Sequence, residues 1–205
     1  KGETPNFDHA KQAVMGVHRR VQGAYSVVAL VVGLGMVAFR DPHGIRPLVM
    51  GTQTIAGETC YAFASESVAF TQSGYRISGD VVAGEIVLVD HQRRLIREVL
   101  PTAKAARPCI FEYIYFARPD SFQDTISVYH ARMRLGEAMA EAWRRTGIPI
   151  DVIVPVPDSS RPSATEMAIA LGVKYREGLI KNRYIGRTFI MPGNESRKRA
   201  IRYKL

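Results

Sequence analysis

The sequence predicts an α+β half followed by an α/β half, and three observations support this fold class. Between residues 24 and 99, valine-rich apolar runs alternate with glycine- and proline-rich turns, as expected of antiparallel hairpins. After residue 124, helical patterns alternate with short apolar runs, which is typical of a parallel sheet with crossover helices. The segment 101–108 has proline at both ends and separates the two patterns, so we predict domains at 1–108 and 109–205.

Positive charge is concentrated near the C-terminus. The chain has 28 Lys and Arg against 19 Asp and Glu, a formal net charge of +9. Residues 181–205 alone contribute +7, and the other 180 residues carry only +2. Such a segment suits an anionic partner, either a polyphosphate or a nucleic-acid backbone. Its basic residues are Lys181, Arg183, Arg187, Arg197, Lys198, Arg199, Arg202 and Lys204.

Composition argues against several classes of protein. The sequence has no run of 18 apolar residues and no basic head followed by an apolar core, so we expect neither a membrane span nor a secretory signal. We therefore expect a cytoplasmic protein. Cys60 and Cys109 lie far apart in apolar surroundings without C-x-x-C spacing, which predicts buried thiols rather than a disulfide or a closed metal site.

The first half begins with an amphipathic helix and a hairpin. Apolar residues recur every three or four positions in and just after 6–20, and Gly23 ends this helical pattern. The apolar runs 24–32 and 36–39 flank Gly33-Leu34-Gly35, which indicates a hairpin. The recurring residues of the helix are Ala10, Val14, Val17 and Val21.

A turn dense in proline, glycine and charge follows at 40–47. We expect Arg40, Asp41 and Arg46 to hold it together through charge-assisted hydrogen bonds to carbonyl groups. His43 has no cysteine or second histidine at useful spacing, so we interpret it as a turn residue rather than a base or ligand. After this turn the sequence predicts strands at 48–51 and 61–64, a helical turn at 65–70, and a hairpin of 85–89 with 95–99.

The seam between the halves is CIFEYIYFARPDS at 109–121. Apolar residues at both odd and even positions of 111–116 predict a strand buried on both faces. Pro119 then ends the strand because it lacks a backbone donor, and Asp120 with Ser121 can cap the helix that follows.

The second half changes period. The patterns predict a long helix at 125–145, a short apolar strand at 151–156, a helix at 163–171 closed by Gly172, and a strand at 173–176. This order predicts a doubly wound parallel half-domain, in which ligands bind at the carboxyl ends of the strands.

Asp158, Ser159 and Ser160 lie between the strand at 151–156 and the next helix. Unpaired amides and the helix dipole would favour an anion there, although the serines can also be simple caps. The phosphate motif G-x-x-x-x-G-K-[ST] is absent, which gives no support to generic ATP chemistry. The polar run at 181–190 is, taken alone, a solvated surface loop.

Two strings, FEYIYFARPDS at 111–121 and KNRYIGRTFI at 181–190, resemble amidophosphoribosyltransferases, also called glutamine phosphoribosylpyrophosphate amidotransferases. The resemblance covers nearly the whole chain and is weakest at 52–104. It implies that 1–108 is the C-terminal part of an N-terminal-nucleophile glutaminase domain, with two packed antiparallel sheets between helices. It also implies that 109–205 is the first part of a type I phosphoribosyltransferase domain.

The resemblance assigns a substrate site to the loop after the apolar strand. Asp158, Ser159 and Ser160 would receive the pyrophosphate and its Mg²⁺, with Ser159 nearest the metal. The implied ligands are phosphoribosyl pyrophosphate and glutamine, bound by a homo-oligomer without nucleic acid or membrane.

The downstream string would form a flexible loop that closes over phosphoribosyl pyrophosphate. Lys181, Tyr184 and Arg187 would face the anionic substrate, whereas Phe189 and Ile190 would line an ammonia channel. Physical chemistry fits this assignment, because cations offset the charge on departing pyrophosphate and an apolar lid excludes water.

The resemblance also implies parts that this sequence lacks. The glutaminase nucleophile would be a processed N-terminal cysteine, whereas residue 1 is Lys1, and Cys60 and Cys109 have no free α-amine. The adjacent aspartates of type I phosphoribosyltransferases are missing too, so we expect this stretch to be an inactive central fragment. Some family members bind an iron–sulfur cluster through a cysteine near Cys109, but one candidate ligand does not establish a cluster.

The complete enzyme would make 5-phosphoribosylamine, pyrophosphate and glutamate from phosphoribosyl pyrophosphate, glutamine and water, the first step of purine synthesis. One alternative is a basic nucleic-acid-binding module, which is disfavoured because few aromatic residues interleave with the basic ones. Another is a phosphoribosyltransferase-like regulator without glutaminase activity.

Overall fold

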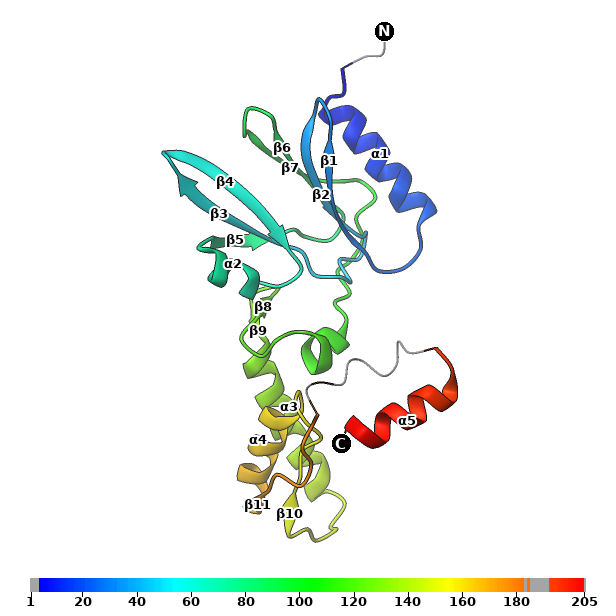
Figure 1. Ribbon diagram of the computed structural model, residues 1–205, viewed down its shortest axis with the longest axis vertical. Coiled ribbons are helices and arrows are strands. Elements are labelled where there is room, and N and C mark those ends of the chain that lie inside the picture. The colour runs from blue at the N-terminus through cyan, green and yellow to red at the C-terminus, as the bar shows by residue number, and fades with distance from the viewer. Residues whose placement is uncertain (1–3, 183, 185–191, 205) are drawn as a thin grey trace. The chain divides into compact units, whose positions relative to one another are not determined.

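The computed structural model describes residues 4–182, 184 and 192–204. Figure 1 shows the chain, which divides into two compact units, Lys1–Val128 and Tyr129–Leu205. This division falls later than the boundary expected between 108 and 109. The assignment of the units to a glutaminase and a phosphoribosyltransferase domain stays a prediction.

Helix α1 (Phe7–Arg20) opens the first unit, as predicted. Asn6 caps the helix because its side chain accepts a hydrogen bond from the amide of His9 at 3.0 Å. The apolar face of α1 buries Ala10 and Val14 in a core shared with a sheet. The helix is therefore held by packing of the stripe that its sequence period predicted.

That sheet has four antiparallel strands in the order β1-β2-β6-β7, and both predicted hairpins are confirmed. Gly35, at the start of β2, has φ +129°, and a Cβ there would lie 2.2 Å from the carbonyl oxygen of Val89. Only glycine allows this close approach of two strands. The strands are β1 (Ser26–Val31), β2 (Gly35–Arg40), β6 (Glu85–Asp90) and β7 (Leu95–Val99).

A second antiparallel sheet has the order β4-β3-β5. Strand β5 (Arg76–Asp80) was not predicted, and its pairing with β3 shifts register at Met50 and Gly51. A Cβ on Gly51 would lie 2.9 Å from the ring of Phe70, so glycine makes room for helix α2. The other elements of this layer are β3 (Val49–Ile55), β4 (Glu58–Ala64) and α2 (Val68–Ser73).

One apolar cluster joins the two sheets of the first unit. It combines residues from β2 and β6 of the four-stranded sheet with residues from β3 and the segments next to it. Burial of this kind contributes about 25 cal/mol per Å² of apolar surface removed from water. The buried members are Ala38, Leu48, Met50, Val81 and Val87.

The predicted strand at 111–116 is wrong, because this stretch forms the π-helix η1 (Glu112–Phe116). Its wide turn is marked by the bond from the amide of Ala117 to the carbonyl of Glu112. Glu112 and Tyr113 are buried, whereas Ile114, Tyr115 and Phe116 are exposed. A short run with apolar residues at nearly every position is compatible with a strand or a helix, so its pattern alone did not distinguish them. In the structure the run is helical, and it turns Glu112 and Tyr113 to the interior.

The side chains of Asp120 and Ser121 do not cap the next helix, although the carbonyl of Ser121 accepts a hydrogen bond from the amide of Val128 at 3.0 Å. The hairpin of β8 (Phe122–Gln123) and β9 (Ile126–Ser127) lies between them and that helix. Asp120 instead accepts hydrogen bonds from the side chain of Arg118, at 3.0 and 2.8 Å.

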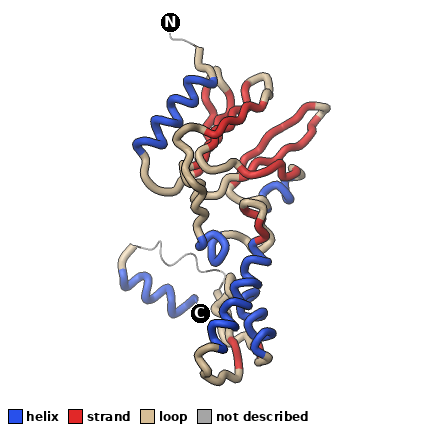
Figure 2. The backbone as a smooth tube through the Cα atoms, turned by 180° about the vertical axis from the view of Figure 1, so that it is seen from behind, coloured by secondary structure: helices blue, strands red, loops and turns tan. Residues whose placement is uncertain are grey.

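The second unit follows the predicted order of helix, strand, helix and strand. Helices dominate it, whereas strands dominate the first unit (Figure 2). The two strands pair in parallel, with Val152 opposite Lys174. Helices α3 and α4 approach closely at Gly136, where a Cβ would lie 2.3 Å from the carbonyl oxygen of Ser163. The elements are α3 (Val128–Arg144), β10 (Val152–Ile153), α4 (Arg161–Leu171), β11 (Lys174–Tyr175) and α5 (Asn194–Lys204).

Two details of the second unit differ from prediction. The strand expected at 151–156 is limited to β10, and Val152, Val154 and Val156 are 43 to 57% exposed. Among the described residues β10 pairs with β11 only, so its side chains lack the cover of a larger sheet. The basic segment after 193 is a helix, α5, although few apolar residues signalled one.

No helix in the described part of the chain combines the length and the apolar character needed to span a membrane.

Candidate functional site

The loop 157–160 connects β10 to α4, at the carboxyl end of the parallel strand. The peptide bond between Pro157 and Asp158 is cis. Ser160 occupies the N-cap position of α4, but its side chain makes no capping bond and donates to the carbonyl of Val156 instead. The interpretation of Ser160 as a side-chain cap is therefore wrong.

Asp158 lies between two cations. Its Oδ2 accepts a hydrogen bond from Nζ of Lys181 at 3.1 Å, and Nη1 of Arg161 lies 3.8 Å from its Oδ1. The three side chains are between 34 and 42% exposed, so a ligand from solvent can reach them. The structure thus brings together Asp158 and Lys181, two predicted site residues that lie 23 positions apart in the sequence.

A second carboxylate, Glu177, completes this polar cluster. Nη2 of Arg161 lies 3.3 Å from Oε2 of Glu177, and the hydroxyl of Tyr175 donates to its Oε1 at 2.6 Å. The pKa of Tyr175 is raised, chiefly because its hydroxyl donates to this carboxylate. Sequence reasoning missed Arg161 and Glu177, although both follow the ends of paired parallel strands, where side chains meet.

Helix α5, which contains much of the basic segment, ends next to Asn182. The amide of Asn182 donates to the carbonyl of Lys204 at 2.8 Å, so the end of α5 lies beside the residue that follows Lys181. The helix begins at Asn194, and its sequence holds five basic residues and one acidic residue. The C-terminal end of α5 therefore lies beside the segment that follows Lys181.

The other predicted site residues have mixed outcomes. Ser159 is half-buried within the loop, and Tyr184 is fully exposed. Arg187, Phe189 and Ile190 lie outside the described residues. Within the described ranges, no group of three or more His, Cys, Asp or Glu side chains could hold a metal ion.

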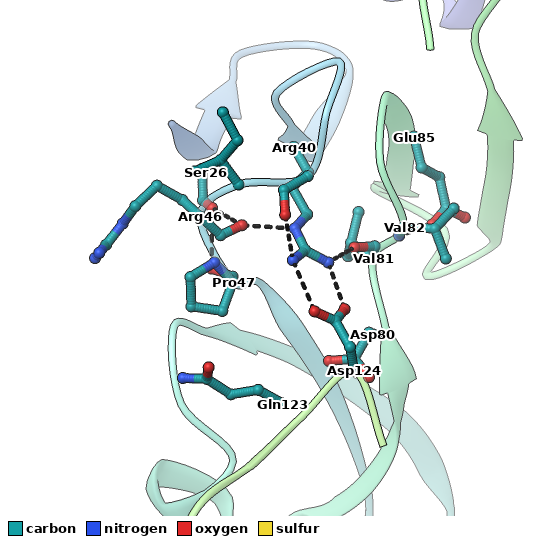
Figure 3. Close-up of polar contacts among 12 residues, drawn as sticks. Ser26, Arg40, Arg46, Pro47, Asp80, Val81, Val82, Glu85, Gln123 and Asp124 are labelled. Atoms are coloured by element: carbon teal, nitrogen blue, oxygen red, sulfur yellow. Dashed lines mark hydrogen bonds and ion pairs between the residues drawn. The ribbon is translucent and has the colours of Figure 1, made fainter. Parts of the chain in front are cut away.

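In the first unit the turn at 40–47 is built around Arg40, as Figure 3 shows. Its guanidinium donates to the carbonyls of Gly44 and Arg46, at 2.7 and 2.5 Å, as predicted. It also reaches the carbonyl of Val81 and both carboxylate oxygens of Asp124. The pairing with Asp124 was not predicted, because the two residues lie in different predicted domains.

Asp41 and Arg46 act differently from the prediction. Asp41 is fully buried, and its carboxylate accepts hydrogen bonds from backbone amides of the turn, including those of His43 and Ile45. The side chain of Arg46 leaves the turn and pairs with Glu112 of η1. Burial raises the pKa of Glu112, and the charge of Arg46 opposes this shift.

Glu66 makes a third connection to the segment 109–127. Its carboxylate accepts hydrogen bonds from the hydroxyl of Ser121 at 2.7 Å and from the amide of Arg118 at 2.8 Å. The hydroxyl of Ser67 accepts one from the amide of Phe122. These contacts explain why 109–127 belongs to the first compact unit.

His43 and the two cysteines of the first unit are all half-buried. Nδ1 of His43 lies 3.1 Å from the carbonyl oxygen of Ala105, which fits a turn residue. Cys60 and Cys109 are both free and half-buried, so neither is as buried as expected. Cys109 lines a small hollow together with Arg40 and Asp124.

Comparisons with known proteins agree with the resemblance expected from the two strings. No family model matches the chain. Three amidophosphoribosyltransferases are similar to it: that of Pseudomonas aeruginosa is 49% identical over 203 residues, that of Escherichia coli 46% over 203, and that of Schizosaccharomyces pombe 44% over 211. These matches cover 95 to 98% of this chain and 39 to 40% of the relatives.

Two solved structures have a similar fold. The glutamine phosphoribosylpyrophosphate amidotransferase of B. subtilis, complexed with ADP and GMP, has a TM-score of 0.73 at 36% identity. A structure described as the allosteric regulatory enzyme of purine biosynthesis has a TM-score of 0.69 at 33% identity. Each is covered to 40 or 43%, and this chain to 96%. The predicted resemblance is confirmed, and the chain spans about two fifths of the length of the proteins it matches.

Proposed function

We propose that this chain is the central part of an amidophosphoribosyltransferase, a pentosyltransferase that starts purine synthesis. The complete enzyme would convert phosphoribosyl pyrophosphate, glutamine and water into 5-phosphoribosylamine, pyrophosphate and glutamate. The observation that carries this proposal is identity of 41 to 49% to curated amidophosphoribosyltransferases over nearly the whole chain. The first unit would support glutamine hydrolysis, and the second would bind phosphoribosyl pyrophosphate.

The loop 157–160 is the proposed site for the pyrophosphate group. Lys181 lies beside it, and its positive charge would offset the charge that grows on departing pyrophosphate. In the structure, Asp158 forms an ion pair with Lys181. Binding would therefore exchange a carboxylate for a phosphate as the partner of this lysine, as charge-assisted bonds to phosphate favour.

The donor atoms of the loop suit Mg²⁺. The carboxylate of Asp158 and the hydroxyl of Ser159 are hard oxygen donors, and Mg²⁺ is commonly held by one or two carboxylates together with substrate phosphates. When bound, the ion would neutralise the pyrophosphate as it leaves. Ser160, whose hydroxyl donates to the carbonyl of Val156, would keep the loop in shape for both.

The segment after Lys181 would close over the substrate. Tyr184 is fully exposed and free to approach a ligand, and Arg187 would add a second cation. Phe189 and Ile190 would line the path of ammonia from the glutaminase site. Water is kept from the reacting sugar when such an apolar segment covers it.

The glutaminase step would use a cysteine nucleophile with a free α-amine outside this chain. The first unit would contribute structurally, since Arg40 donates to a carbonyl of the turn at 40–47 and Asp41 accepts from an amide of the same turn. The enzyme would act in the cytoplasm, as a homo-oligomer, without nucleic acid. No comparison favours a nucleic-acid module or a regulator lacking glutaminase activity, and an iron–sulfur cluster at Cys109 is not proposed.

An assay of the full-length protein tests this proposal. Purified enzyme with phosphoribosyl pyrophosphate and Mg²⁺ should release pyrophosphate when given glutamine, with one glutamate formed per pyrophosphate. Ammonia should replace glutamine in the transferase step, because that step needs only the amine. Glutamate release without any consumption of phosphoribosyl pyrophosphate, or no reaction with either nitrogen source, would disprove the proposal.

A further inference from the structure

The side chain of Arg161 is shared between two carboxylates. Its Nη2 lies 3.3 Å from Oε2 of Glu177, whereas its Nη1 lies 3.8 Å from Oδ1 of Asp158. The contact with Glu177 is within hydrogen-bonding distance, and the contact with Asp158 is longer. The guanidinium is thus drawn toward Glu177 and away from Asp158.

Glu177 is itself fixed in place. The hydroxyl of Tyr175, at the end of β11, donates to its Oε1 at 2.6 Å, which leaves Oε2 for Arg161. Tyr175 also contacts the side chain of Thr165 on α4. Tyr175, which contacts α4, therefore restrains the carboxylate of Glu177 that pairs with Arg161.

The role of Asp158 in this inference rests on the proposed function, in which its carboxylate helps to bind Mg²⁺. Its carboxylate already accepts a hydrogen bond from Lys181 through Oδ2, and Oδ1 is the atom that faces Arg161. A closer pair with Arg161 would neutralise this carboxylate from both sides. It would then be a poorer ligand for the Mg²⁺ that accompanies pyrophosphate.

We infer that Glu177 is a positioning residue, which restrains Arg161 so that the carboxylate of Asp158 stays available to the Mg²⁺ that binds with phosphoribosyl pyrophosphate. Glu177 acts through Arg161 and need not touch the substrate. If Glu177 is made neutral, Asp158 becomes the nearest carboxylate for Arg161. If Arg161 is removed as well, the competitor is gone and Asp158 is released.

The test compares substitutions in the full-length enzyme, with ammonia as the nitrogen donor so that only the transferase step is measured. Glu177→Gln should raise KM for phosphoribosyl pyrophosphate about fivefold, the scale of a partly exposed ion pair, while kcat stays within about twofold. The double variant Arg161→Gln with Glu177→Gln should return KM to within about twofold of the parent. Glu137→Gln on the exposed face of α3 changes the charge equally and should leave KM unchanged.

The outcomes separate the two proposals. A parent enzyme that consumes no phosphoribosyl pyrophosphate would refute the proposed function itself. An active parent whose Glu177→Gln variant has normal KM, or whose double variant is no better than the single one, would overturn the positioning role alone. A loss in kcat together with a lower melting temperature in both variants would show that Glu177 is merely structural.

Discussion

Nη1 of Arg40 lies 3.0 Å from Oδ1 of Asp124, although 84 positions separate the two residues in the chain. Arg40 is 3% exposed and Asp124 is 38% exposed at the side chain. Asp124 also has φ +46° in the turn of the β8–β9 hairpin. The ion pair therefore fastens a strained hairpin turn to the interior of the first unit.

Asp124→Asn should weaken this attachment with little other change. Asparagine tolerates positive φ as aspartate does, so the substitution removes the charge and keeps the backbone preference. Loss of a charge-assisted bond to a buried arginine should cost about 1 to 3 kcal/mol. Amide hydrogen exchange at 122–127 in the full-length enzyme should accelerate accordingly.

Asp120→Asn provides the matched control for that measurement. Asp120 pairs with Arg118 at 2.8 Å, but both side chains are more than half exposed. Such surface pairs contribute about 0 to 1 kcal/mol, so exchange at 122–127 should stay nearly unchanged. Equal acceleration in both variants would contradict a special role for the buried arginine.

The boundary of the first unit gives a second prediction. Residues 109–127 are attached to it by the pairs of Arg46 with Glu112 and of Glu66 with Ser121, in addition to Arg40 with Asp124. A full N-terminal domain ending at Val128 should therefore unfold cooperatively. The same domain ending at Pro108 would leave Arg40 buried without its carboxylate and should be clearly less stable. Urea unfolding of the two truncations measures this, and equal midpoints would support the earlier boundary instead.

Elements that depend on the local spacing of apolar residues were predicted from the sequence. Elements that depend on contacts with residues far away in the chain were missed. Ala10 and Val14 of α1 recur at helical spacing, and packing followed that stripe. Strand β5 is a short, polar run that becomes a strand because β3 pairs with it. Likewise η1 is settled by the pairing of Glu112 with Arg46, 66 positions away. No window of neighbouring residues contains that information.

The same limit applies to the candidate site. Asp158 and Lys181 were assigned from the family resemblance, and the structure brings them together. Arg161 and Glu177 lie outside the strings and carry no motif of their own. Their contact arises because the segment after β11 runs beside the start of α4. That proximity depends on the three-dimensional fold and cannot be read from the spacing of residues in the sequence.

His18 predicts how stability changes with pH. It is 9% exposed, and its Nδ1 lies 2.6 Å from the hydroxyl oxygen of Thr102. Burial lowers the pKa of His18 below 6.5, while the charge of Asp41 and the backbone of Arg40 oppose the shift. The folded state thus favours neutral histidine, so stability is fully present above pH 6.5 and falls as pH drops toward the lower folded pKa.

Melting temperatures measured from pH 8 to pH 5 check this dependence. The parent should lose stability below about pH 6.5, and His18→Gln should lose less over that interval because glutamine binds no proton. His91→Gln, in an exposed turn, should follow the parent. A His18→Gln variant whose pH profile parallels the parent would show that other groups govern the acid side.

Lys181 gives the prediction closest to the proposed chemistry. Its Nζ lies 3.1 Å from Oδ2 of Asp158, and in the proposed function it would contact the pyrophosphate instead. Lys181→Gln in the full-length enzyme should raise KM for phosphoribosyl pyrophosphate about tenfold, the scale of one charge-assisted contact of about 1.5 kcal/mol. Glutamine-dependent and ammonia-dependent synthesis should suffer equally, because both use the same transferase step. Lys174→Gln on the exposed side of β11 removes the same charge and should leave KM within about twofold. A Lys181→Gln enzyme that loses only the glutamine-dependent reaction would place this lysine in ammonia transfer rather than at the pyrophosphate.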